Sequence, residues 1–133
     1  MRIIRDNHEF DVDIQKTYEY YNSHSLCDCP ACKNYYLQAE KTFPVLSSFL
    51  ADFGVNISKP DETGWSEEGE EIDYHFAAYT VAGTIEGFDQ YEIDIKDGGL
   101  SLNVVFNNKY IPNEQTSEFF VITVYGIRLP KTV

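Results

Sequence analysis

The chain has 133 residues, with 10 Lys and Arg against 22 Asp and Glu, and so a formal net charge of −12. This charge rules out most nucleic-acid binding and disfavours anionic membrane surfaces, because both depend on basic residues. The apolar content of 43% is too high for a disordered chain, and the length is typical of one domain, so we expect a single domain over residues 1–133.

No apolar run approaches the roughly 18 residues that cross a membrane, and the first residues lack the apolar region of a signal peptide. The expected location is therefore the cytoplasm, where thiols stay reduced. In that compartment three cysteines within six positions indicate metal binding or redox chemistry rather than a disulfide framework.

The first predicted element is a strand over residues 9–15. Phe10, Val12 and Ile14 alternate there with polar residues, which is typical of a strand with one wet face. The polar segment 22–25 is predicted to be a turn that leads into a helical region.

Apolar residues then recur at intervals of three and four over residues 32–53, which predicts a helix with one buried face. Pro30 suits the first helical position, with Cys29 as the cap, because a proline there loses no hydrogen bond. Since the pattern keeps its phase through Pro44, we expect two collinear helices or one kinked helix, ended by Gly54.

The second half of the chain is predicted to form strands. Residues 72–85 indicate a longer strand, or a strand with a bulge near Gly83. Residues 118–128 indicate a strand that is apolar on both faces, which predicts a central position or a covered edge. The expected fold class is α+β, an antiparallel sheet of about five strands with the helical layer packed on one face.

Residues 90–107 indicate a β-hairpin. We expect Asp97 and Gly98 to form a two-residue type I′ turn, which pairs Ile95 with Leu100 and brings the apolar residues of both strands onto one face.

A strongly acidic segment over residues 61–73 is predicted to be a solvated loop, because Pro60 directly precedes it and it contains Gly64 and Gly69. It carries Trp65 as a candidate anchor for a basic protein partner. The acidic residues expected to face that partner are Glu67, Glu68, Glu70 and Glu71. A solvated loop whose tryptophan folds back onto the domain is the plainer alternative.

The cysteine segment is the main candidate for chemistry. Cys27, Cys29 and Cys32 supply three thiolates and His24 an imidazole, a ligand set that suits tetrahedral zinc. The four candidates are closer in sequence than is usual in structural zinc sites, so His75 or His8 is an alternative fourth ligand.

A second hypothesis is thiol redox chemistry. The segment Cys29-Pro30-Ala31-Cys32 opens a helix, where free N–H groups lower the pKa of a thiol. It resembles the active-site Cys-x-x-Cys of the thioredoxin and glutaredoxin superfamily, although it follows a polar turn instead of a strand. The third alternative is simple packing, because cysteine is also a good small core residue.

The segment 27–35, the helix after it, and the later segments 54–57 and Lys59-Pro60 resemble an uncharacterised family of small bacterial proteins with a Cys-x-Cys-x-x-Cys entry to a helix. This resemblance implies a related fold and no particular activity.

No nucleophile with a base, phosphate-binding glycine loop or EF-hand ligand order is present in the sequence. The sequence therefore favours a cytosolic, non-enzymatic protein-binding module with a small structural zinc-type site and an acidic interaction surface.

Overall fold

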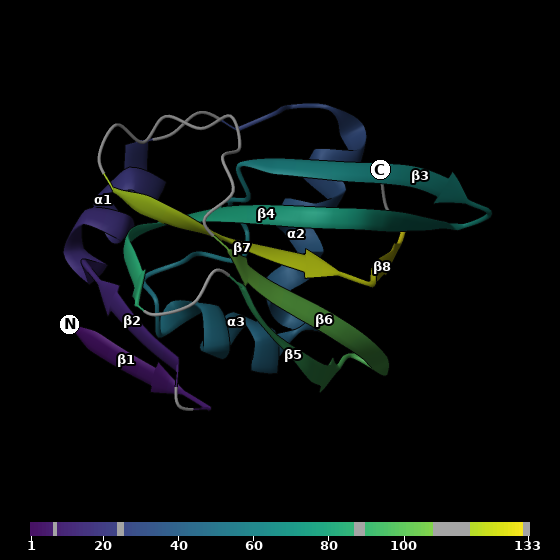
Figure 1. Cartoon of the computed structure of the whole chain (residues 1–133). Helices are drawn as coiled ribbons and strands as arrows, with labels where there is room; N and C mark the ends of the chain where they lie inside the picture. Colours follow the sequence, from purple (N-terminus) through teal and green to yellow (C-terminus); the bar gives the residue numbers. More distant parts are fainter. Residues whose placement is uncertain (7, 24–25, 87–89, 108–117, 132–133) are drawn as a thin grey trace.

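A computed structural model describes residues 1–6, 8–23, 26–86, 90–107 and 118–131. This part of the chain forms eight strands and three helices, which confirms the α+β class (Figure 1). The helices are α1 (Ile14–Ser23), α2 (Pro30–Thr42) and α3 (Pro44–Ala51). The strands are β1 (Arg2–Arg5), β2 (His8–Val12), β3 (Glu62–Glu68), β4 (Glu71–Glu86), β5 (Gln90–Asp97), β6 (Leu100–Asn107), β7 (Phe119–Tyr125) and β8 (Ile127–Pro130).

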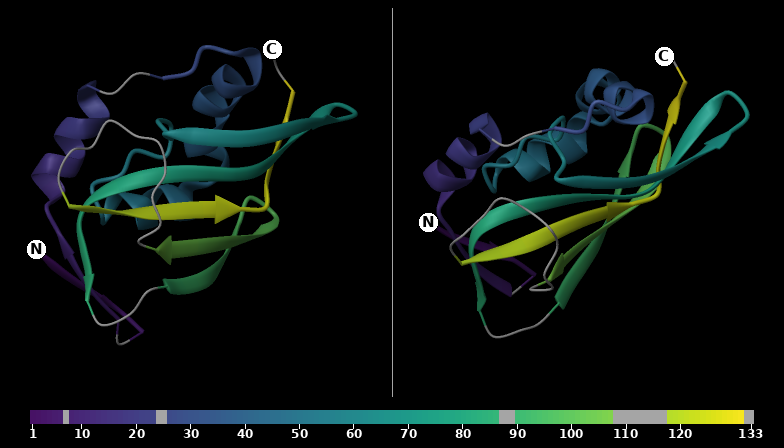
Figure 2. Two further views of the ribbon diagram at one scale, coloured as in Figure 1. Left: turned by 45° about the horizontal axis from the view of Figure 1, so that its top comes forward. Right: turned by 90° about the horizontal axis from the view of Figure 1, so that it is seen from above.

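The strands form one antiparallel sheet in the order β1-β2-β4-β7-β6-β5, with β3 and β8 also paired to β4. Strand β4 organises the sheet, because its 16 residues are long enough to pair with β3 and β2 along one edge and with β8 and β7 along the other. The three helices lie on one side of the sheet (Figure 2, right). The expected number of about five strands was too low, because β1, β3 and β8 are short or polar and carry little apolar alternation.

The helical region is divided at Pro44, as its sequence predicts, into α2 and α3. Pro30 occupies the first turn of α2, and the Sγ atom of Cys29 accepts a hydrogen bond from the backbone N–H of Cys32 at 3.3 Å. The chain leaves the helical region through Gly54, whose φ of +80° favours glycine. The predicted helix start, break and end are therefore all confirmed.

Helix α1 was not predicted, and the first predicted strand was too long. Strand β2 ends at Val12, and the Asp13 side chain caps α1 by accepting a hydrogen bond from the backbone N–H of Lys16 at 3.0 Å. The helix is fixed to β4 by Thr17, whose Oγ1 accepts from the N–H of Ala82 at 3.0 Å. The helix start was missed because Ile14 continues the alternation of Phe10 and Val12, so it was assigned to the strand although it is the first residue of α1.

The hairpin of β5 and β6 is confirmed, but the predicted register differs from the observed one by two residues. The turn is made by Gly98 and Gly99, whose φ values are 59° and 78°, so Asp97 belongs to the strand and pairs with Leu100. Ile95 consequently pairs with Leu102. A shift of two keeps every apolar side chain on the same face, so the alternation could not distinguish the two registers.

The acidic segment is a β-hairpin and not a loop. Strands β3 and β4 pair from Glu68 with Glu71 back to Glu62 with Ala78, with an irregularity after Gly64. The tip of this hairpin projects from the body of the molecule (Figures 1 and 2). Strand β3 is an edge strand, and charged residues on an edge strand prevent it from pairing with another chain. Its composition is therefore similar to that of a solvated loop.

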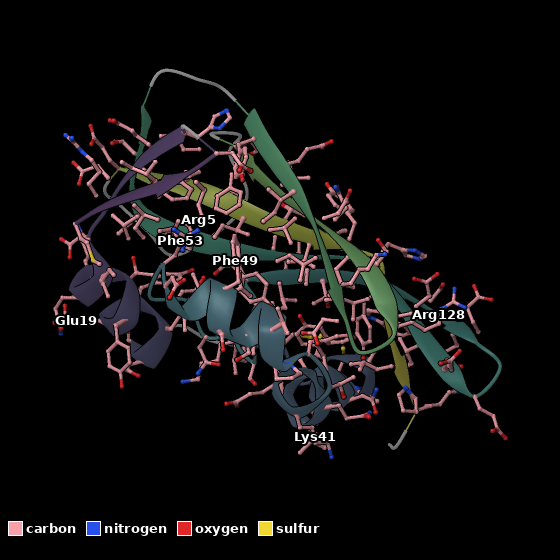
Figure 3. All side chains as sticks on the ribbon, turned by 90° about the horizontal axis from the view of Figure 1, so that it is seen from below. Arg5, Glu19, Lys41, Phe49, Phe53 and Arg128 are labelled. Carbon is pink, nitrogen blue, oxygen red and sulfur yellow. The ribbon has the colours of Figure 1, made fainter. Side chains whose placement is uncertain are left out.

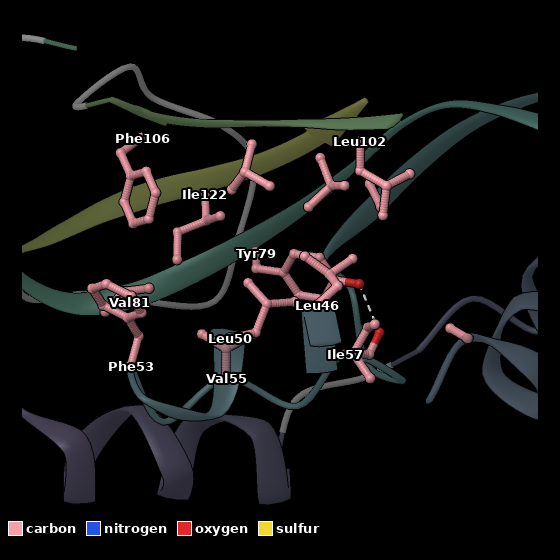
Figure 4. Close-up of a cluster of buried hydrophobic side chains, with 14 of the residues drawn as sticks. Leu46, Leu50, Phe53, Val55, Ile57, Tyr79, Val81, Leu102, Phe106 and Ile122 are labelled. Carbon is pink, nitrogen blue, oxygen red and sulfur yellow. Dashed lines mark hydrogen bonds between the residues drawn. The ribbon is translucent and has the colours of Figure 1, made fainter. Parts of the chain in front are cut away.

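The core lies between the sheet and the helices (Figure 4). Leu46 and Leu50 of α3 pack there with side chains from the central strands, including Tyr79, Val81 and Ile122. Strand β7 lies between β4 and β6, which confirms its predicted central position. The strand pair β1 and β2 contacts α3 through Arg5, which binds Asp52 at 2.9 Å and lies over the ring of Phe49 (Figure 3).

Within the described ranges, no helix is both long and apolar enough to cross a membrane.

Candidate metal-thiolate site

The three cysteines meet at the entrance to α2. The Sγ atoms of Cys27, Cys29 and Cys32 all lie within 4.8 Å of one another, so together they could hold a metal ion. Cys27 is exposed, Cys29 is half-buried and Cys32 is buried, so the cluster has one side open to solvent. The sequence favours this arrangement locally, because Pro30 begins the helix and leaves Cys29 as the N-cap. The Cys29 side chain then accepts a hydrogen bond from the backbone N–H of Cys32.

The thiols of Cys29 and Cys32 have opposite electrostatic character. Desolvation raises the pKa of Cys29, but hydrogen bonds from the thiol and backbone of Cys32 and from the Cys27 thiol more than offset it, so the pKa lies below the usual value. Burial, and then the hydrogen bond to Cys29, raise the pKa of Cys32 to about 12. In the metal-free protein Cys29 is therefore the thiol that ionises most readily of the two.

Neighbouring residues hold the cluster in place. The Cys32 Sγ atom lies 3.6 Å from the Thr63 Oγ1 atom of β3, and the Tyr36 hydroxyl donates to the Cys27 carbonyl at 2.7 Å. The Tyr74 hydroxyl of β4 donates to the carbonyl of Ala31 at 2.7 Å. These contacts fix the start of α2 against the sheet.

A buried polar network extends this attachment along α2. The side-chain amides of Asn34 and Gln38 both donate to the carbonyl of Pro130 in β8, at 3.0 and 2.7 Å, and Gln38 also donates to Asn34 at 3.0 Å. A displaced α2 would leave these buried groups unpaired, which is costly. The cluster is thus built on a firmly fixed helix.

The candidate fourth ligands from the sequence are three histidines. His24, the first candidate from sequence, lies outside the described residues. The two described histidines, His8 and His75, are not part of the cluster. His8 instead stacks on the ring of Tyr91 at 4.4 Å between ring centroids.

The acidic residues of the β3–β4 hairpin do not form one continuous face. Trp65 and Glu67 pair with Tyr74 and Ile72, which are buried on the helix side, so they lie on the same side of the sheet as the cysteines. Glu68 alternates to the opposite side. Glu70 and Glu71 lie at the turn and the start of β4, and all four glutamates are exposed.

The hairpin also carries internal charge pairing. Glu67 forms an ion pair with Lys131 at 3.3 Å, and Glu68 accepts a hydrogen bond from Ser66 at 3.4 Å. Trp65 is 41% exposed, so it does not fold back fully onto the domain. Thr63, two residues earlier, connects this side of β3 to Cys32. The two candidate sites are therefore neighbours across one side of the molecule.

Sequence reasoning missed the residues that support the cluster. Thr63 and Tyr74 come from strands that pack against α2, and no local signal relates them to the cysteines. The apolar spacing of α2 predicted a buried face, but it did not show that Asn34 and Gln38 are on it. Polar residues are normally assigned to the surface, so a satisfied buried amide has no signature in a single sequence.

Comparisons with protein-family models, curated proteins and solved structures find no significant match to this chain.

Proposed function

We propose that the protein is a zinc-thiolate protein in which Cys27, Cys29 and Cys32 hold the ion at the entrance to α2. The observation that carries this proposal is the convergence of three Sγ atoms within 4.8 Å. Zn–S bonds of about 2.3 Å in a tetrahedral site place sulfur atoms about 3.8 Å apart, so a small inward movement completes the site. If the cysteines served only as small core residues, their three Sγ atoms would not need to lie so close together.

In this proposal the ion has a structural role. It joins the segment before α2 to the helix start, and through the contact of Cys32 with Thr63 it stabilises the base of the β3–β4 hairpin. His24 is the proposed fourth ligand, carried over from the sequence hypothesis. The N–H groups at the start of α2 favour the negative charge of the thiolates.

Metal analysis tests the site. Protein purified without added metal is expected to contain about one equivalent of zinc, and its removal by a chelator is expected to lower the melting temperature. Cys27→Ser is the informative variant, because Cys27 is exposed and its loss leaves the core intact. It should lower the zinc affinity by tenfold or more, whereas Ser66→Ala should not change it. Less than about half an equivalent in the wild type contradicts the proposal.

We further propose that the β3–β4 hairpin binds a basic protein partner, with Trp65 as the apolar anchor and the four glutamates around the tip. The net charge of −12 and the 41% exposure of Trp65 support this. Affinity capture from native cytosol, with a variant in which Glu67, Glu68, Glu70 and Glu71 are changed to glutamine, tests it. A partner retained equally by both proteins contradicts the hairpin as the binding surface.

A second candidate is thiol–disulfide exchange through Cys29 and Cys32. It is favoured by one observation, the lowered pKa of the half-buried Cys29 beside the raised pKa of the buried Cys32. In exchange with oxidised glutathione, the Cys29 thiolate attacks one sulfur, glutathione thiolate leaves, and Cys32 then displaces the second glutathione to form the intramolecular disulfide. Cys29→Ser should abolish this reaction in zinc-free protein, and Cys27→Ser should not.

A further inference from the structure

A hollow of about 370 Å³ lies among the helices, away from the cysteine cluster. Its walls come from α1, α2, α3 and the segment after α3. Apolar and aromatic side chains make up most of the lining: Ile14, Tyr18, Tyr21, Ala51, Val55 and Ile57. This volume is within the range of about 300 to 1,000 Å³ that small-molecule sites occupy.

Two tyrosines of α1 give the hollow its aromatic surface. The Tyr21 hydroxyl donates to the carbonyl of Thr80 in β4 at 2.7 Å, so the polar end of this side chain is used on the sheet side. Its ring carbons are left to line the hollow. Tyr18 is 58% exposed at the mouth, where a ligand would cover its ring. An aromatic face attracts cations through its quadrupole.

The charge in the hollow has one sign. Glu40 of α2 is the only charged residue that lines it, and among the described residues this exposed carboxylate has no hydrogen bond or ion pair. The nearby cation Lys59 does not line the hollow, and its Nζ atom donates to the carbonyl of Tyr21 at 3.0 Å. The net charge of −12 also attracts cations over long range.

We propose that this hollow binds a small organic ammonium ion, with the apolar body against the tyrosine rings and aliphatic side chains and the ammonium group at Glu40. The proposal is independent of the zinc site. The lining also includes the polar residues Asn22, Ser47 and Asn56, whose side chains can offer further hydrogen-bonding groups to the ligand. An anionic ligand of the same shape would meet only repulsion from Glu40.

Three probes of similar size separate charge from shape: phenethylamine, 2-phenylethanol and 3-phenylpropionate. Binding is followed by ¹H–¹⁵N NMR of the whole chain. We expect the amine to shift the signals of residues 54–57 and to bind about tenfold more tightly than the alcohol, with no binding of the carboxylate. Equal binding of all three probes, or shifts elsewhere in the protein, would overturn the proposal.

Two variants and one control complete the test. Ala51→Trp fills the hollow from an exposed position at the end of α3 and should abolish amine binding. Glu40→Gln keeps the shape of the hollow and should lower the affinity for phenethylamine to that for 2-phenylethanol. Glu19→Gln changes the net charge by the same amount from the outer side of α1 (Figure 3) and should leave binding unchanged. If Glu19→Gln weakens binding as much as Glu40→Gln, the attraction is non-specific and the site is wrong.

Discussion

The backbone N–H of Leu46, in the first turn of α3, donates a hydrogen bond of 2.9 Å to the carboxylate of Asp97 at the end of β5. The residue before the helix, Phe43, provides no side-chain cap. Asp97 therefore caps α3 from 51 residues away in the sequence, and its negative charge lies at the positive end of the helix dipole.

Removal of this cap should destabilise the protein measurably. Asp97→Ala leaves the buried N–H of Leu46 without a partner, so the free energy of unfolding should fall by about 1 to 3 kcal/mol. Asp97→Asn keeps an acceptor and should lose less than half as much. Urea unfolding followed by circular dichroism measures both. Equal losses in the two variants would show that the hydrogen bond is not what stabilises this contact.

The same residue explains why the hairpin register could not be read from sequence. Asp-Gly is a strong turn signal, but here Asp97 is held in the strand by its contact with α3, and the turn moves on to Gly98 and Gly99. Local turn preference and apolar alternation allow both registers. A contact between distant elements decides between them, and one sequence does not contain that information.

The well-predicted parts share strong local signals. Pro30, Pro44 and Gly54 fix helix boundaries through their own backbone chemistry, and they were placed correctly. The cysteine cluster was found because three thiols within six positions are brought close by chain connectivity. The long strand predicted over residues 72–85 is β4, but β3 was missed because its charged sequence forms a strand only through pairing with β4, which composition does not reveal.

Gly83 of β4 pairs with Val12 of β2. We expect its replacement to have a large effect on stability. Its φ is +146°, and an added Cβ would be 2.0 Å from the carbonyl oxygen of Asp11. Gly83→Ala should therefore lower the free energy of unfolding by about 3 kcal/mol or more, because backbone and strand must both move.

Gly99→Ala is the matched control for backbone strain. This glycine also has a positive φ, 78°, but nothing lies within 4 Å of an added Cβ. We expect a loss of only about 1 kcal/mol, the cost of the left-handed conformation. Chemical denaturation of both variants gives the comparison. Similar losses would mean that the close approach of Asp11 is relieved easily.

Two buried tyrosine hydroxyls form a directed chain. Tyr79 donates to the carbonyl of Ile57 at 2.7 Å, so its single proton is used and Tyr35 must be the donor in the 2.5 Å contact between the two hydroxyls. Tyr79→Phe leaves a donor and an acceptor unpaired, and Tyr35→Phe removes only the last donor. The first substitution should lower the free energy of unfolding by about 2 kcal/mol, and the second by about 1 kcal/mol. The reverse order in thermal unfolding would contradict the assigned direction.

Trp65 offers an internal probe of the proposed metal site. It is the only tryptophan of the chain and lies on the same side of the sheet as the cysteines. Cobalt bound to thiolates absorbs strongly at the wavelengths of tryptophan emission, so titration with Co²⁺ should quench the fluorescence of Trp65. Cys27→Ser should weaken the quenching. Thiolate–cobalt absorption that develops without quenching would show that Trp65 is too far from the cluster.

Alkaline pH should destabilise the fold through its buried phenols. Burial raises the pKa of Tyr21, Tyr35 and Tyr79 above the ordinary value of 10, because the charged phenolate is poorly solvated in the core. Between pH 10 and the folded-state pKa values the unfolded chain has lost these protons and the folded chain retains them. Stability is therefore fully present below pH 10 and falls as the pH rises, by about 1.4 kcal/mol per pH unit for each such tyrosine.

Urea unfolding between pH 8 and 11 measures this decline, and absorbance of the phenolate follows the ionisation directly. The matched variant is Tyr35→Phe, which removes one titrating group while Tyr79 keeps its hydrogen bond to Ile57. Its stability should fall less steeply above pH 10 than that of the wild type. If both proteins lose stability at the same rate, the alkaline transition comes from other groups, such as the lysines, and Tyr35 does not contribute to it.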